Sequence, residues 1–264
     1  MLEATIEGIG FWGGGLPDWD SACALLRSGT VPEVAATRPS PQVLAANERR
    51  RAPLTVAVAL EAAMAACDAA DRSPKILSSV FTSTHGEQSI TDYMCTTLAD
   101  DPRAISPTKF HNSVHNAAAG YWTIGTGTHA AATAISAGPH SFAQGLLEAM
   151  VQLHAGEDAV LLVAYDGPGS GTLARVAPSE GLLGLAMVLS RTPCIGLPTL
   201  QLDVLQEKPD LPADTEDEGV LARRLAGNAM QPALPLLEAI ALDREAVWMP
   251  AGEQQWLRLG IHHD

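Results

Sequence analysis

The spacing of apolar residues along the chain switches between the period of a helix and that of a strand. Phe142, Leu146, Met150 and Leu153 lie on one face of a predicted helix that Gly156 ends. Similar patterns predict helices over residues 19–28, 54–70, 89–98, 117–125 and 139–155, and over 222–242 with a break near Pro232. Pro139 fits the first turn of its helix, where the missing N–H costs nothing.

Short β-branched or continuously apolar runs predict the strands. They cover residues 6–11, 76–82, 130–134, 159–165 and 182–189, and a closing hairpin is expected from 247–249 and 256–259. The run 159–165 does not alternate with polar residues, which is typical of a strand buried on both faces. Proline and polar residues predict irregular segments over 30–53 and 101–116, and an exposed acidic loop over 206–219.

The alternation of strands and helices predicts an α/β fold with a mixed or largely parallel sheet and helices on both faces. The chain has 264 residues, of which 47% are apolar. This is enough for a sizeable core, and nothing in the pattern separates the chain into two parts. We therefore expect a single domain over residues 1–264.

Charge and targeting signals narrow the range of partners. The chain carries 30 acidic and 16 basic residues, a formal charge of −14, which disfavours nucleic acid and anionic membranes. No apolar run is as long as a membrane span, and the first residues lack the pattern of a signal peptide, so we expect a cytoplasmic protein. The four cysteines have no metal-binding spacing, and Cys95 has apolar neighbours that predict a buried thiol.

An ordered series of short motifs carries more specific information. Glu48-Arg49-Arg50-Arg51 precedes an alanine-rich helix, and His85-Gly86-Glu87 follows a strand. Residues 105–110 read Ile-Ser-Pro-Thr-Lys-Phe, residues 111–122 read His-Asn-Ser-Val-His-Asn-Ala-Ala-Ala-Gly-Tyr-Trp, and residues 133–138 read Thr-Ala-Ile-Ser-Ala-Gly. In this order the motifs resemble the N-terminal half of β-ketoacyl synthases, which have the thiolase-like fold. The segment 227–239 also resembles a short branch of that family, found beside full ketosynthases in aryl-polyene-type pathways.

The resemblance implies a loss of catalysis. In the family, a cysteine at the end of a strand opens a helix, where a thiol is readily ionised to the attacking thiolate. This chain has Ile135 in that position and lacks the two histidine motifs that stabilise the enolate oxyanion. A catalytically silent subunit of the chain-length-factor type is therefore expected. It would pair with a full-length β-ketoacyl synthase, meet the acyl carrier protein through that partner, and need no cofactor.

The same resemblance selects candidate residues for an acyl tunnel or a subunit interface. They lie in the loop at 108–122 and the helix start at 135–142: Phe110, His111, Asn112, His115, Asn116, Tyr121, Trp122, Ile135, Ser136 and Phe142. Tyr121 and Trp122 are by default core residues, and Ser136 fits a helix cap before Pro139.

Other functions remain open at this point. An acyltransferase or ketosynthase with a different nucleophile is one alternative, although no Gly-x-Ser-x-Gly surrounds Ser136. A freestanding homodimeric acyl-binding or scaffold protein is another. His111 and His115 have the spacing of helical metal ligands, but no glutamate stands beside either, so no metal is expected. The glycine-rich segment 166–171 has no lysine at phosphate-binding spacing and is interpreted as a flexible loop.

Overall fold

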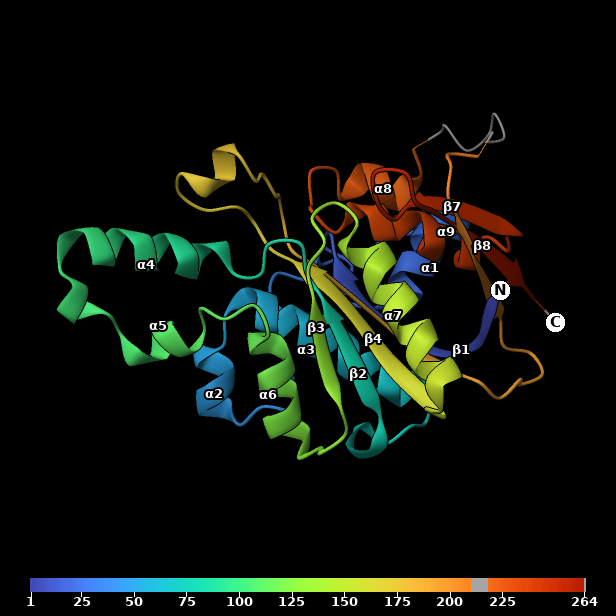
Figure 1. Ribbon diagram of the computed structural model, residues 1–264, viewed down its shortest axis with the longest axis horizontal. Helices are drawn as coiled ribbons and strands as arrows, with labels where there is room; N and C mark the ends of the chain where they lie inside the picture. Colours follow the sequence, from blue (N-terminus) through green and yellow to red (C-terminus); the bar gives the residue numbers. More distant parts are fainter. Residues whose placement is uncertain (210–217, 264) are drawn as a thin grey trace.

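The computed structural model describes residues 1–209 and 218–263, in which eight strands form one mixed sheet (Figure 1). The strand order is β3-β2-β4-β5-β1-β6-β8-β7. The strands are β1 (Leu2–Gly13), β2 (Ser78–Thr82), β3 (Ala132–Ile135), β4 (Ala159–Asp166), β5 (Leu183–Ser190), β6 (Thr199–Leu205), β7 (Ala246–Pro250) and β8 (Trp256–His262). β2 pairs in parallel with β3 and β4, and the other pairs are antiparallel. The predicted mixed sheet is confirmed.

Helices cover both faces of the sheet, and each face has its own hydrophobic core. α3 (Leu54–Ala69) and α6 (Ala117–Thr126) pack on one face. The other face is covered by α1 (Trp19–Ser28), α7 (Ser141–Ala155), α8 (Val220–Arg224) and α9 (Leu234–Ala241). Successive residues of β4 alternate between the two cores: Leu162 joins the core below α7, whereas Leu161 and Val163 join the core below α3. This explains why the run 159–165 shows no polar alternation.

The contact between β1 and α3 requires glycine. A Cβ atom on Gly10 would collide with the backbone carbonyl of Ala62, and one on Gly8 would collide with that of Ala66. Because backbone atoms cannot move aside, only glycine lets α3 lie this close to the strand.

Predicted and observed elements agree best where the signals are local. The helix at 19–28 is found with its predicted bounds, and Gly29 ends it at φ 72°. The helices at 54–70, 89–98 and 117–125 and the closing hairpin are present with small shifts. Leu2–Gly13 is longer than the predicted strand 6–11.

Several expectations were wrong. The irregular segments contain two short helices, α2 (Ala46–Arg51) and α5 (Pro107–His111), and β6 was not foreseen. α7 begins at Ser141, so Pro139 lies before the helix, where a bridge pairs it with Ala137. The predicted helix 222–242 is divided into α8, a short 3-10 turn (Gln231–Ala233) and α9. Most of the predicted acidic loop, residues 210–217, lies outside the described residues.

A projecting arm is formed by residues 88–111, which include α4 (Gln88–Asp100) and α5 (Figure 1). The backbone N–H of Ser106 donates to the Tyr93 hydroxyl at 2.9 Å, and the Lys109 ammonium lies 5.6 Å from the centre of the Tyr93 ring. Within α4, only Gln88 and Ile90 are buried. Cys95 is exposed, so the predicted buried thiol was wrong, because the helix that carries it leaves the body of the molecule.

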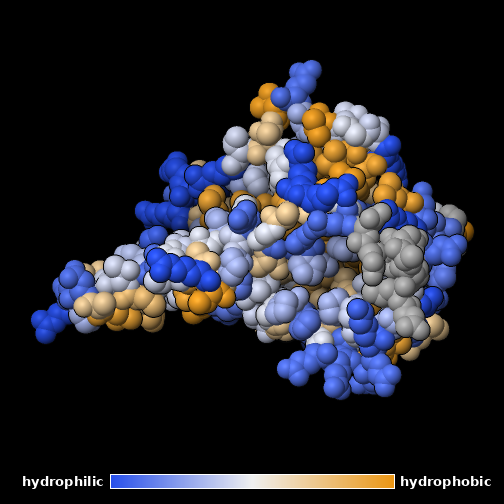
Figure 2. Space-filling model, turned by 90° about the horizontal axis from the view of Figure 1, so that it is seen from above, coloured by the Kyte–Doolittle hydropathy of each residue, from blue (hydrophilic) through white to orange (hydrophobic). Residues whose placement is uncertain are grey.

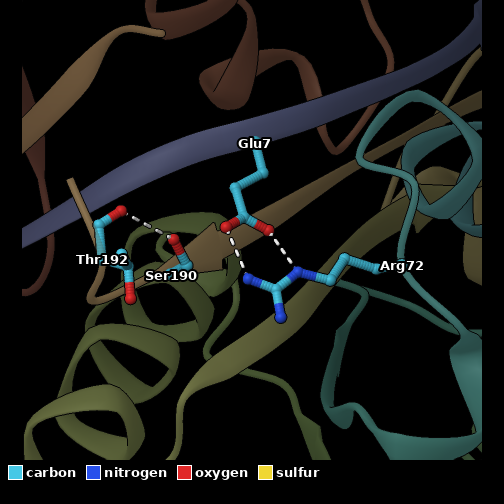
Figure 3. A network of polar contacts seen from close by, with 4 residues as sticks. All are labelled: Glu7, Arg72, Ser190 and Thr192. Atoms are coloured by element: carbon cyan, nitrogen blue, oxygen red, sulfur yellow. Dashed lines mark hydrogen bonds and ion pairs between the residues drawn. The ribbon is translucent and has the colours of Figure 1, made fainter. Parts of the chain in front are cut away.

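An ion pair fastens the end of α3 to β1 (Figure 3). The Arg72 guanidinium donates from two nitrogens to the Glu7 carboxylate, at 2.6 and 2.7 Å. Ser190 lies beside the pair, and its hydroxyl donates to the carbonyl of Thr192 at 3.3 Å. Burial alone would raise the pKa of Glu7, but the hydrogen bonds from Arg72 and its positive charge outweigh that effect and lower this pKa below its usual value.

Candidate functional site

The resemblance points to the junction between β3 and α7. Ile135 is the last residue of β3, paired with Thr82 of β2, and α7 starts at Ser141. The Ser141 hydroxyl accepts a hydrogen bond from the N–H of Ala137 and donates one to the carbonyl of Gly138, which fixes the connecting turn. Ile135 therefore lies at a strand-to-helix junction, although it ends the strand and does not open the helix.

A cavity of about 650 Å³ adjoins this junction. Its apolar wall comes from three segments: the end of β3, one face of α7, and the turn between β7 and β8. The lining includes Ile135, Ala137, Leu147, Val151 and Ala251, with Ser136, His140, Gln144, Glu148, Gly252 and Glu253 as further residues. The Gln144 side chain donates to the carbonyl of Ala251 at 2.6 Å, which ties the β7–β8 turn to α7. The C-terminal hairpin thus closes one side of the cavity.

Behind the junction, the loop 83–86 that follows β2 is the centre of a hydrogen-bond network. The Ser136 hydroxyl donates to the carbonyl of Thr84 at 3.0 Å, and the His115 ring Nε2 lies 2.9 Å from the carbonyl of Ser83. A carbonyl only accepts, so His115 Nε2 carries the proton. Ser136 thus bonds to a neighbouring loop, and the structure does not bear out its predicted role as a helix cap.

Asp166, the last residue of β4, is a buried acceptor of hydrogen bonds from this loop. Its carboxylate accepts hydrogen bonds from the Ser83 hydroxyl at 2.8 Å, the Thr84 N–H at 2.8 Å and the His85 N–H at 3.0 Å. The residue is fully buried. Burial raises its pKa, and the three hydrogen bonds only partly oppose that rise.

Sequence analysis missed Asp166, because it was assigned to a flexible glycine-rich loop. The available signal was its position as the first charged residue after seven apolar ones in the run 159–165. The segment 227–239 also reaches this network, since the carbonyl of Ala229 accepts a hydrogen bond from the Thr84 hydroxyl and the Asn228 side chain donates to the backbone carbonyl of Asp166 at 3.5 Å.

The ten candidate residues fall into two groups. Phe142 and Trp122 lie in the two cores, and Asn112 is also buried, so none of them offers side-chain surface to a partner in this conformation. Trp122 packs near Phe81, with ring centres 6.3 Å apart. Phe110, His111, Asn116 and Ser136 are exposed, and His115, Tyr121 and Ile135 are half-buried.

The two histidines that have the spacing of helical metal ligands make different contacts. His111 ends α5 and packs edge-on against Tyr121 at 6.1 Å, whereas His115 lies between α5 and α6 and reaches Ser83. Within residues 1–209 and 218–263, no three histidine, cysteine, aspartate or glutamate side chains gather as potential metal ligands. In the same ranges no helix has both the length and the apolar character required to cross a bilayer.

Exposed apolar side chains occur on the segments that precede β3 and on β3 itself. Phe110, Val114 and Ile124 are 62%, 52% and 70% exposed, and Ala132 and Ala134 of β3 are exposed as well. Viewed from above, the arm projects from the body and carries hydrophobic surface along part of its length (Figure 2).

Comparison with known families places the chain. Residues 26–257 match the family described as beta-ketoacyl synthase, N-terminal domain, and the chain therefore belongs to this family. No curated protein matches the sequence.

Three solved structures share the fold. One is the ketosynthase ApeO in complex with its chain length factor ApeC from Xenorhabdus doucetiae, with 21% identity, a TM-score of 0.73, and coverage of 98% of this chain and 100% of that chain. The ishigamide ketosynthase/chain length factor has 12% identity, a TM-score of 0.74, and coverage of 100% and 99%. The type II acyl carrier protein AntF with its ketosynthase AntDE has 12% identity, a TM-score of 0.73, and coverage of 100% and 99%. At these identities the likeness shows the thiolase-like fold.

Proposed function

We propose that this chain is a chain-length-factor-type subunit that has no condensing activity of its own and pairs with a full-length β-ketoacyl synthase. The observation that carries the proposal is Ile135, a hydrocarbon side chain at the strand-to-helix junction, on the wall of a mainly apolar cavity. Condensation needs a thiolate where the acyl chain is held, and an isoleucine side chain has no ionisable atom.

Neighbouring groups do not replace the missing nucleophile. Ser136 is adjacent, but its hydroxyl donates to the carbonyl of Thr84, which cannot act as a base. Among residues 155–264 the only histidines are His262 and His263. In the proposed complex, the imidazole pair that stabilises the oxyanion comes from the ketosynthase.

The open edge of β3 supports pairing with a second chain. β3 ends the sheet and pairs only with β2 in the part of the chain that the structure describes. Its four residues carry no charge, and the exposed apolar residues Phe110, Val114 and Ile124 lie on the segments that precede it. An uncharged open edge is typical of a strand that is covered by a partner, and exposed apolar side chains on the preceding segments add surface suited to a contact. Two of the similar structures contain a ketosynthase together with a chain length factor.

The contribution to the complex would be steric. Ile135 packs against the core below α7 and limits the cavity at the end of β3. In the complex, this side chain and the exposed residues near 110 would limit the length of the acyl chain, and carrier protein would dock through the ketosynthase. We place such a complex in fatty-acid or polyketide-type assembly of the aryl polyene kind. That residues 1–264 form one domain remains our prediction.

Co-expression with a candidate full-length ketosynthase tests the proposal. We expect a stable complex whose longest product lengthens when Ile135→Ala widens the cavity and shortens with Ile135→Trp. Ile76→Ala is the matched control, since Ile76 is 70% exposed and lies before the start of β2, whereas Ile135 is the last residue of the neighbouring strand β3. If product length is the same for all three variants, the steric role is wrong.

Two further measurements decide between the alternatives. Incubation of the isolated chain with an acyl thioester, followed by intact-mass measurement, should give no adduct; a stable adduct would support an acyltransferase with another nucleophile. Size measurement with and without the ketosynthase should show a heterodimer, whereas a homodimer that ignores the ketosynthase would support a freestanding scaffold.

A further inference from the structure

The loop 83–86 connects the two segments that the proposed function uses. The carbonyl of Thr84 binds Ser136, next to Ile135 on the cavity wall, and the carbonyl of Ser83 binds His115, just before α6. The Tyr165 hydroxyl also donates to the carbonyl of His115, at 3.4 Å. A shift of this loop would therefore move the junction and the start of α6 together.

Asp166 makes contacts that suit a role in shaping this loop. Three consecutive residues, Ser83, Thr84 and His85, donate to its two carboxylate oxygens. The Ser83 hydroxyl in turn accepts from the N–H of Gly86 at 2.9 Å, and Gly86 has a φ of 63°. The parallel pairing of β2 with β4 fixes the distance between the donors on the loop after β2 and the Asp166 carboxylate at the end of β4.

A fully buried carboxylate with no basic partner is costly to maintain. Among the described residues no ion pair involves Asp166. An apolar side chain at the same point would leave two part-buried N–H groups and a buried hydroxyl without acceptors, whereas ordinary packing of β4 needs no charge there. The burial of this group is explained if the loop must hold one particular shape.

We propose that Asp166 is a positioning residue: through loop 83–86 it fixes Ser136 at the cavity wall and His115 at the start of α6. The functional consequence rests on the proposed function, because it is in the complex that these two segments would meet the ketosynthase. The positioning itself is a property of the isolated chain, and this allows the two ideas to be tested separately.

Asp166→Asn is the informative variant, because it keeps the volume of the side chain. Ser83 and His85 donate to Oδ1, whereas Thr84 donates to Oδ2. An amide has only one acceptor oxygen, so its NH₂ group must face at least one of these donors. Asp158→Asn is the matched control. Asp158 stands immediately before the first residue of β4, at the other end of the strand from Asp166, and its side chain is 91% exposed. Asp166→Ala removes all three contacts and serves only to report the effect on folding.

The first measurement is nitrogen–proton NMR of the histidine rings in the isolated chain. We expect wild type and Asp158→Asn to show the His115 Nε2–H in one hydrogen-bonded state. In Asp166→Asn this signal should shift and its proton should exchange with water faster, while the protein stays folded. A folded Asp166→Asn protein with an unchanged His115 signal would overturn the proposal.

The second measurement is affinity for the ketosynthase. We expect Asp166→Asn to weaken the complex roughly tenfold, an effect typical of losing one hydrogen bond to a charged group, and Asp158→Asn to leave it unchanged. A changed His115 signal with unchanged affinity would overturn the link between the loop and the interface. If the wild-type chain itself binds no ketosynthase, the proposed function fails, and the NMR result still decides the role of Asp166.

Discussion

β3 and β4 lie on opposite sides of β2 and run parallel to it, but the chain covers them very differently. All eight residues of β4 are buried, and its side chains fill both cores. None of the four residues of β3 is buried, and one edge of the strand is open. The environment of β4 is completed within this chain, whereas one edge of β3 is left open, and under the proposed function the ketosynthase covers that edge. Four predictions test this contrast.

The largest expected effect is in the buried strand. Leu162→Ala removes a fully buried side chain from the core below α7 and should lower the free energy of unfolding by about 2–5 kcal/mol, because the cavity it leaves closes only partly. Urea denaturation of the isolated chain measures this loss. A loss below about 1 kcal/mol would mean that the β4 core is loosely packed.

A substitution in the edge strand β3 should affect binding to the ketosynthase and leave the stability of the chain almost unchanged. Ala134→Lys places a charge on exposed β3 and should change the free energy of unfolding by no more than about 0.5 kcal/mol. It should weaken the complex with the ketosynthase at least roughly tenfold, because an unpaired charge would be buried in the contact. Titration with labelled ketosynthase measures the affinity, with Ala134→Ser as the control. Equal affinity of the two variants would exclude the β3 edge as the interface.

The interior also contains a charged pair whose effect depends on pH. The pKa of Glu7 is lowered in the folded state. Its contribution to the free energy of unfolding is therefore complete above the pKa of the unfolded chain, about 4.3, and is lost as the pH falls through the folded pKa. Glu7→Gln should cost about 1 kcal/mol at pH 7, because Arg72 remains partly exposed to solvent. Urea denaturation at pH 7 and at pH 3 compares the two proteins. The difference between them should narrow at the lower pH, and a constant difference would contradict this assignment.

The smallest effect concerns thiol reactivity and requires no substitution. Burial raises the pKa of the Cys67 thiol to about 12, so this thiol should not react with a disulfide reagent in the native protein. The exposed Cys95 and Cys194 should react readily. Peptide mapping after brief labelling identifies the modified residues. Fast labelling of Cys67 in the folded chain would show that α3 opens away from the sheet.

The sequence predicted those features whose signals are local. Gly29 and Gly156 end α1 and α7 with positive φ, as predicted for a glycine that follows a helix. The order of the motifs indicated the family, and the strand-to-helix junction lies next to residue 135 as the resemblance implied. The tunnel and interface roles of the ten candidate residues stay predictions.

Only the tertiary structure decided features that depend on distant segments. β6 was missed although Leu200, Leu202 and Val204 alternate with polar residues, and only the structure shows that it pairs between β1 and β8, which are far apart in the sequence. Cys95 was expected to be buried because its neighbours are apolar, but the arm has no second layer to cover it. In the interior, Asp166 accepts hydrogen bonds from three donors on the loop after β2. These contacts join residues far apart in the sequence, so no local pattern predicts them. Periodicity reports which side chains share a face, whereas strand order and burial depend on contacts made only after folding.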